Sequence, residues 1–306
     1  MSDPVKITST DYGRQIFWMA WGTRLLFMAA IVMVAELTWD RPFYVGAVDA
    51  TRYHRVASEI SQLLAAGNFQ QVFPHLAGEY LEHTDNYGVP FVLGFVYTFT
   101  GSSVIVAKVF MTLMGAGTAF FSYKTAKLIT DESTARLAGI LIAFFPLSLF
   151  YSSVILKEEF VVFLSMVGIF LLTKSVVKGR IKLWELAVLI SSVSILFLFR
   201  TAAGALMVSL VVGIYFMNRI KGSVLISLSM STIIILGFFY FIDAFGEVDY
   251  YVERVSGVFD YSEARIRSIA QENTMASIVG IPTFVVLSFI APFPSMVYLP
   301  LGNPST

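Results

Sequence analysis

The chain has 306 residues, of which 57% are hydrophobic and 14% are charged, and its net charge is +0. This composition excludes a soluble globular protein, and the balanced charge gives no reason to expect a nucleic-acid partner. The absence of cysteine excludes disulfides, zinc–thiolate sites and thiol nucleophiles. The sequence therefore predicts an integral membrane protein, long enough for about eight spans of roughly 20 residues each.

Apolar runs of membrane length predict where the chain crosses the bilayer. They lie near residues 16–38, 103–123, 135–152, 160–177, 184–200, 202–217, 223–242 and 277–297. The first run is too long for a signal peptide and lacks a small-residue cleavage site, so we interpret it as a retained anchor. The apolar segment 89–100 has only about 12 residues, too few to span, and is predicted to be a re-entrant or interfacial half-helix.

The distribution of Lys and Arg predicts the orientation. If segment 89–100 does not cross, one side of the membrane collects Lys6, Arg14, Lys124, Lys127, Arg136, Lys174, Lys178, Arg180, Lys182, Arg219 and Lys221. Such density in short segments is typical of the cytoplasmic side, which places the N-terminus in the cytoplasm. The segments on the opposite side are then 40–88, 152–159, the turn at Arg200 and Thr201, and 244–276.

The outer segments are predicted to carry amphipathic helices. In the first of them, Tyr53, Val56, Ile60, Leu63 and Leu64 recur at helical spacing. The last mixes aromatic with charged residues, which is typical of a segment lying along the membrane surface. The predicted fold is therefore an all-α, polytopic helical bundle. It has about eight transmembrane helices, one half-helix and amphipathic helices in the first outer loop, all in a single integral membrane domain, residues 1–306.

Ionisable residues at the outer ends of the spans are the candidate functional groups, because such residues are costly at a membrane border unless they are paired, hydrated or used. The set is Asp49, Arg52, Lys157, Glu158, Glu159 and Arg200, with Tyr53 next to Arg52. Structural roles are the alternative for several of them. The two glutamates could simply stabilise a helix N-terminus through its dipole, and Arg200 could be a snorkelling helix cap.

Behind the short N-terminal tail and the first span, distinctive segments follow in a fixed order. They are GAVDATRYHRVASEI, YGVPFVLGFVYTFTG, SYKTAKLITDESTARLAG and FFPLSLFYSSVILKEEF. In order and spacing they resemble the N-terminal module of the C-type (GT-C) glycosyltransferases. That family includes the protein O-mannosyltransferases, the lipid A aminoarabinose transferase and the catalytic subunit of oligosaccharyltransferase. The module would occupy residues 16–200, including the outer loop 40–88, and residues 201–306 would add further helices.

The resemblance implies catalytic roles for two acids. In this family the acid of the first outer loop is the catalytic base or orients the acceptor, and it maps onto Asp49. The second acid follows a proline and an aromatic–serine pair, so Pro146 and Tyr151–Ser152 place it at Glu158. The remaining candidates, expected to bind substrates, are Arg52, Tyr53, Lys157, Glu159 and Arg200.

The resemblance also implies the substrates. The donor is a sugar on a polyprenyl phosphate or diphosphate, and the acceptor is a lipid, a glycan or a protein. No cofactor is expected, because the phosphate leaving group is already a weak base and needs only cations to stabilise its charge. A divalent metal is an alternative, since His54, His75 and His83 share one loop with acids; those acids are Glu79, Glu82 and Asp85.

Other functions stay open at this point. A glycan polymerase or ligase would use similar outer-face architecture and differ in its products. A transporter or flippase would need polar groups near the bilayer midplane, and a non-catalytic scaffold would have no use for the two acids. The reading we adopt is a multi-pass protein of a cytoplasmic or inner membrane, with its active site on the extracytoplasmic side.

Overall fold

The structure is a computed structural model, and it describes residues 12–39, 42, 48–79 and 86–220. It divides the chain into two compact units, Met1–Gly222 and Ser223–Thr306. All described residues belong to the first unit, so the prediction of a single domain over residues 1–306 stays a prediction.

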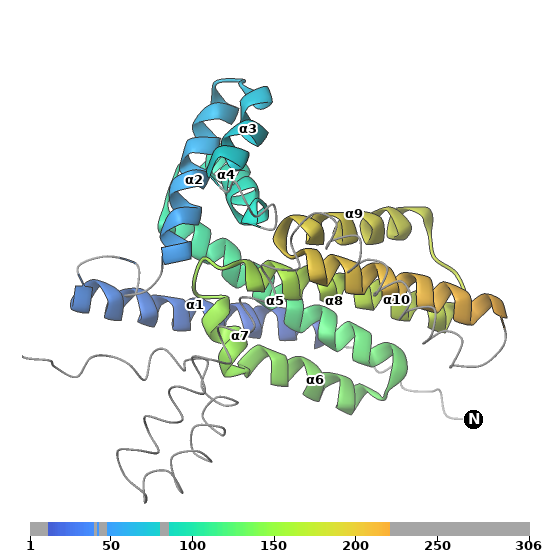
Figure 1. Ribbon diagram of the computed structural model, residues 1–306. Helices are drawn as coiled ribbons and strands as arrows, with labels where there is room; N and C mark the ends of the chain where they lie inside the picture. The colour runs from blue at the N-terminus through green and yellow to red at the C-terminus, as the bar shows by residue number, and fades with distance from the viewer. Residues whose placement is uncertain (1–11, 40–41, 43–47, 80–85, 221–306) are drawn as a thin grey trace, which may run out of the picture. The chain divides into compact units, whose positions relative to one another are not determined.

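Every regular element in the described residues is an α-helix. In chain order these are α1 (Tyr12–Trp39), α2 (Val48–Ala65), α3 (Phe69–Glu79), α4 (Gly88–Thr100), α5 (Val104–Ile129), α6 (Glu132–Phe144), α7 (Pro146–Tyr151), α8 (Lys157–Lys178), α9 (Leu183–Phe199) and α10 (Thr201–Ile220) (Figure 1). The all-α prediction is therefore confirmed for this part of the chain.

Three of these helices, α1, α5 and α8, are long and apolar enough to cross a membrane. Helices α4 and α9 and the first part of α10 are apolar but shorter. The structure thus confirms a helical membrane protein, while the number of eight spans stays a prediction. The predicted spans at 223–242 and 277–297, and the outer loop at 244–276, lie outside the described residues.

The structure divides the predicted span 135–152 into two helices. Helix α6 ends at Phe144 and α7 begins at Pro146, with Phe145 in an extended conformation between them. Proline has no amide hydrogen to donate and disfavours helical geometry at the residue before it, which explains the break. The last carbonyls of α6 therefore need another donor.

Helix α5 lies at the centre of the described spans and contacts α1, α6 and α8. The buried side of α5 consists largely of small residues, among them Gly115, Ala116, Gly117 and Ala119. Small side chains allow close approach of neighbouring helices in a membrane. Helices α9 and α10 pack on α8 beyond this group.

Helices α2, α3 and α4 lie side by side and share an apolar core (Figure 1). Close packing of α2 on α4 depends on Gly94, because a Cβ there would stand 2.5 Å from Cγ2 of Ile60. The predicted amphipathic helix of the first outer loop is α2, and its buried residues include Tyr53, Val56 and Ile60. The predicted half-helix 89–100 corresponds to α4.

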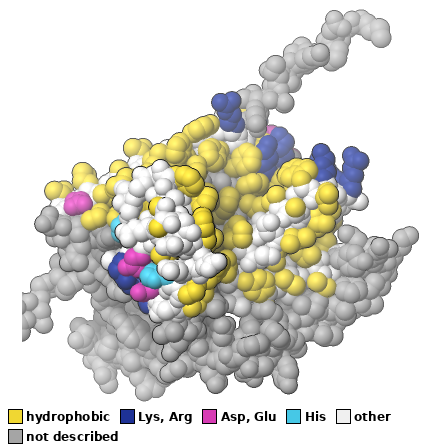
Figure 2. All heavy atoms as spheres, turned by 90° about the horizontal axis from the view of Figure 1, so that it is seen from above, with side chains coloured by type: hydrophobic (Ala, Val, Ile, Leu, Met, Phe, Trp, Pro, Cys, Tyr) yellow, Lys and Arg dark blue, Asp and Glu magenta, His cyan; other side chains and the backbone are white. Residues whose placement is uncertain are grey.

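Basic residues gather where α1 begins, α5 ends and α6 begins. The guanidinium of Arg136 lies 3.2 Å from the ring centroid of Tyr12, and Lys127 pairs with Glu132 at 2.8 Å. In Figure 2, Lys and Arg side chains concentrate at one side of the described surface, and a cluster of both charge signs with histidine lies at another. Lys127 and Arg136 belong to the set that the sequence assigns to the cytoplasmic side, and that orientation stays a prediction.

Candidate functional site

The first turn of α8 carries three of the predicted site residues: Lys157, Glu158 and Glu159. The residue before it, Leu156, is extended and offers no side-chain cap, so the amide groups at this helix start are not capped by a side chain. Carboxylates in a first turn interact favourably with the helix dipole. Since successive residues point about 100° apart around a helix, the three side chains face different neighbours.

Lys157 is joined to α2 through a single amide. Its Nζ donates to Oδ1 of Asn86 at 2.8 Å, and the Tyr53 hydroxyl donates to the same oxygen at 3.0 Å. Two donors converging on one atom identify it as the amide oxygen. Tyr53 is a buried residue of α2, and Asn86 lies two residues before the start of α4. Asn86 therefore links α2, α4 and α8.

Glu158 and Arg200 belong to the same region of the molecule. The Tyr151 side chain, at the end of α7, interacts electrostatically with both Glu158 and Arg200. Arg200 itself is exposed and follows Phe199, whose ring stacks on Phe160 of α8 with the centroids 4.7 Å apart. The end of α9 is thereby held against the first turn of α8.

Asp49 lies in the first turn of α2 and is exposed. It precedes Tyr53 by one helical turn, so the two residues share a side of α2. Tyr53, one turn after Asp49, bonds to Asn86 and through this amide reaches Lys157 of α8. Arg52 points elsewhere, since its guanidinium donates to the backbone carbonyl of Glu79 at the end of α3.

Glu159 is set apart from the other predicted site residues. Only 2% of it is exposed, and its charge interacts with Arg24 of α1 in the interior. The expectation that Glu159 binds substrate therefore has no geometric support from the residues around it.

Two residues that the sequence analysis did not select take part in the site. Asn86 provides the shared acceptor, and Tyr151 interacts electrostatically with Glu158 and with Arg200. A polar amide immediately before the apolar segment YGVPFVLGF is the signal that could have identified Asn86. Tyr151 was used only as a landmark for locating Glu158.

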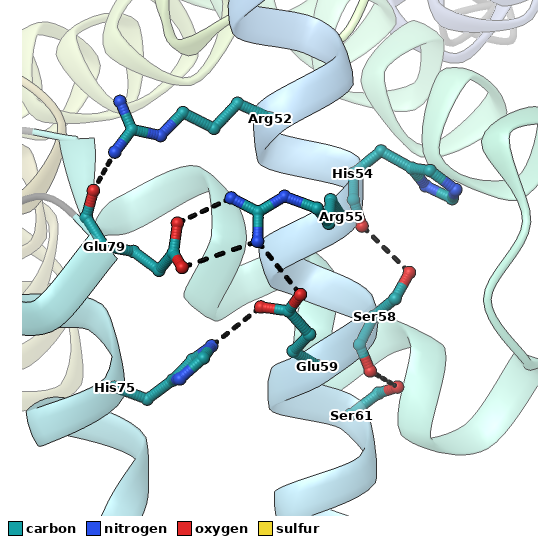
Figure 3. A network of polar contacts seen from close by, with 8 residues as sticks. All are labelled: Arg52, His54, Arg55, Ser58, Glu59, Ser61, His75 and Glu79. Atoms are coloured by element: carbon teal, nitrogen blue, oxygen red, sulfur yellow. Dashed lines mark hydrogen bonds and ion pairs between the residues drawn. The ribbon is translucent and has the colours of Figure 1, made fainter.

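A second polar group joins α2 to α3 on the surface (Figure 3). Arg55 pairs with Glu59 at 3.0 Å and with Glu79 at 2.6 Å, and Nε2 of His75 lies 2.9 Å from Glu59. The hydrogen bond from Arg55 lowers the pKa of the Glu79 carboxyl. The acids and bases of this group satisfy one another, which indicates a role in holding α3 against α2.

The histidines are divided between different environments. Nδ1 of His54 lies 2.7 Å from the Tyr97 hydroxyl of α4, and burial lowers the pKa of His54. His75 belongs to the surface network with Arg55, and His83 lies outside the described residues. Among the residues that the structure describes, no three His, Asp or Glu side chains are arranged to hold a metal ion.

The start of α8 and the residue after α9 supply groups of both charge signs. Lys157 and Arg200 are cations, and Glu158, next to Lys157 in the first turn of α8, is a carboxylate. The unsatisfied amides of the helix start add a partial positive charge. This combination suits a phosphate group that carries, or approaches, a reactive hydroxyl.

No protein-family model matches this chain, and neither does any curated protein sequence or any solved structure. The resemblance to the GT-C module therefore depends on the sequence segments alone.

The Arg55–Glu79 pair makes the stability of the α2–α3 contact depend on pH. Because the pKa of Glu79 is lower in the folded protein, the pair stabilises the fold above the unfolded pKa of the carboxyl and is lost as pH falls through the folded pKa. We expect Glu79→Gln to lower the melting temperature at pH 7 by a few degrees at most, since exposed pairs contribute roughly 0.2–1 kcal/mol. The difference from wild type should shrink below the unfolded pKa of the carboxyl and vanish once the pH lies below its lowered pKa in the folded protein.

The complementary variant is Arg55→Gln, which also removes the pair with Glu59 and should therefore lower the melting temperature at pH 7 at least as much. The double variant Arg55→Gln/Glu79→Gln should be at least as stable as the less stable of the two single variants. A Glu79→Gln deficit of the same size at low pH would show that the carboxylate charge is not what stabilises this contact.

Proposed function

We propose that this protein is a glycosyltransferase that moves a sugar from a polyprenyl-phosphate-linked donor to an acceptor at the extracytoplasmic membrane face. The observation that carries the proposal is the bonding of Tyr53 and Lys157 to the same oxygen of Asn86. This contact joins the helix that bears Asp49 to the helix that begins with Lys157 and Glu158. Both helices belong to segments that resemble the GT-C module.

The reaction proposed here needs cations near the leaving group. The acceptor oxygen forms a bond to the anomeric carbon of the sugar, and the bond from that carbon to the phosphate oxygen breaks. Lys157 and Arg200 would stabilise the negative charge that grows on the released polyprenyl phosphate. Preorganised cations in a water-poor site typically supply several kcal/mol of such stabilisation.

The proton of the acceptor hydroxyl needs a base, and Asp49 is proposed to accept or orient it. General base catalysis of this kind contributes about 10²–10⁴ in rate. Glu158 would orient the acceptor or the sugar from the opposite helix. No cofactor enters this scheme. The acceptor, whether lipid, glycan or protein, would approach from the outer aqueous side.

The proposal extends to the membrane arrangement. We propose about eight spans, an N-terminus in the cytoplasm and α4 as a half-helix that does not cross. The exposed side of α4 supports contact of this helix with lipid. Phe95 is 58% exposed and Phe99 is 74% exposed, whereas the polar Tyr97 turns inward and is 2% exposed. A helix that presents bare phenyl rings outward and its hydroxyl inward suits contact with lipid.

Asp49→Asn tests the base. The substitution preserves size and the exposed position, so we expect an unchanged melting temperature and unchanged donor binding, with sugar transfer reduced by about 10²-fold or more. The measurement is turnover of purified protein with a polyprenyl-phosphate sugar. Glu36→Gln, at another exposed acid, near the end of α1, is the control and should retain activity. Near-normal turnover of Asp49→Asn would remove this residue from the mechanism.

Asn86→Asp tests the proposed anion site. A carboxylate at this position would neutralise Lys157, so the affinity for polyprenyl phosphate should fall by about tenfold or more, equivalent to roughly 1.4 kcal/mol. Lys157→Ala and Arg200→Ala should weaken donor binding in the same assay, more than acceptor binding. Tyr53→Phe, which removes only one of the two bonds to Asn86, should have the smallest effect. Donor binding that is insensitive to all of these changes contradicts the site.

Spin labels test whether α4 contacts lipid. The chain contains no cysteine, so a single cysteine at Phe95 or Phe99 can be labelled specifically. In reconstituted bilayers, labels at both positions should collide more often with oxygen, which partitions into lipid, than with a water-soluble nickel chelate. Gln70 of α3, which is exposed and polar, should show the opposite preference. Labels on α4 that behave like the Gln70 label would place α4 in water.

A further inference from the structure

Arg24 lies in the middle of α1 and is 0% exposed. Its guanidinium donates to the carbonyls of Ala143 and Ile142, each at 3.1 Å, and to the Ser148 hydroxyl at 2.7 Å. These acceptors flank the break between α6 and α7. In an unbroken helix the Ile142 carbonyl would accept from residue 146, which is proline and has no amide hydrogen. Arg24 therefore supplies donors that the break removes.

The opposite charge comes from α8. Glu159 is 2% exposed and interacts electrostatically with Arg24. Among the described residues, Nε of Arg24 and Oε1 of Glu159 are the buried side-chain atoms that lack a hydrogen-bond partner. An isolated charge at such a site is costly, whereas a pair of opposite charges can persist.

The two unpartnered atoms both lie beside Gly115 of α5. A Cβ at Gly115 would stand 2.4 Å from Nε of Arg24 and 2.8 Å from Oε1 of Glu159. It would also stand 2.8 Å from Cβ of Ser152, in the turn before α8. The charged groups thus occupy the space that the absence of a side chain at Gly115 provides.

We infer that Arg24 and Glu159 form an intramembrane charge pair that positions the first turn of α8, and with it Lys157 and Glu158. The pair ties α8 to α1 and to the α6–α7 break across α5. Glu159 and Arg24 are positioning residues that act through the backbone of α8. This inference goes beyond the proposed transferase activity, because it concerns where α8 begins and is tested without any substrate.

Charge-removing variants separate the pair from ordinary packing. Glu159→Gln leaves the buried guanidinium without a counter-charge, and we expect the melting temperature to fall by roughly 6–15 °C. Arg24→Gln/Glu159→Gln leaves no unpaired charge and should melt closer to wild type than the sum of the single variants predicts. Strictly additive shifts would overturn the charge pair.

Glycine variants test the meeting point. Gly115→Ala should destabilise strongly, because its Cβ would collide with both charged groups. Gly168→Ala is the matched control within α8, since its Cβ would meet mainly Cε of Met207, the flexible end of a side chain. A Gly115→Ala variant as stable as Gly168→Ala would also overturn the inference.

The positioning claim needs a readout that stability alone does not change. Spin labels on cysteines at Gln62 of α2 and Val162 of α8, both exposed, report the distance between these helices. Measured well below every melting temperature, the distance distribution should be narrow in wild type. It should broaden or shift in Glu159→Gln and in the double variant. Unchanged distributions would reduce the pair to a stabilising contact and refute the positioning role.

Discussion

The packing of the described helices depends most on the contacts of the buried Arg24 guanidinium. It satisfies carbonyls that Pro146 leaves without donors, and it interacts electrostatically with Glu159 at the start of α8. Both tasks concern polar groups that water cannot reach, so neither can be left undone at low cost. A helix break and a buried acid, each unfavourable alone, become compatible because one side chain serves both.

The small residues of α5 make this arrangement possible. Gly115 gives the charged groups room, and Gly117, two residues further along α5, gives the ring of Phe163 room. Small residues in membrane helices are usually explained by close approach of two backbones. Here the space is taken by side chains instead, and at Gly115 those side chains are charged. The position of α8 relative to α5 is thus set by polar contacts as well as by apolar packing.

The sequence predicts a described helix well where one periodicity or one long apolar run is enough to define it. Helices α1, α5 and α8 match predicted spans because their length and composition are sufficient. The α6–α7 break was missed because the apolar run continues through Pro146. The Arg24–Glu159 pair was missed because the two residues are distant in sequence and no pattern joins them. Whether Lys157, Glu158 or Glu159 points inward depends on neighbours that sequence periodicity does not supply.

The candidate site combines a positive potential with a carboxylate at the start of one helix. The start of α8 offers positive potential from its amides and from Lys157, while Glu158 keeps a carboxylate within the same turn. The separation between that carboxylate and Asp49 is set by how α2 packs on α4 and by how α4 packs on α8 and α9. Gly94 allows the close packing of α2 on α4, and Gly88, whose Cβ would stand 2.7 Å from the Phe199 ring, allows close packing against α9. The Asn86 amide then provides a polar link between α2 and α8. The relative placement of the two acids is therefore a property of packing around glycines, and the chemistry proposed for them depends on residues that carry no chemistry themselves.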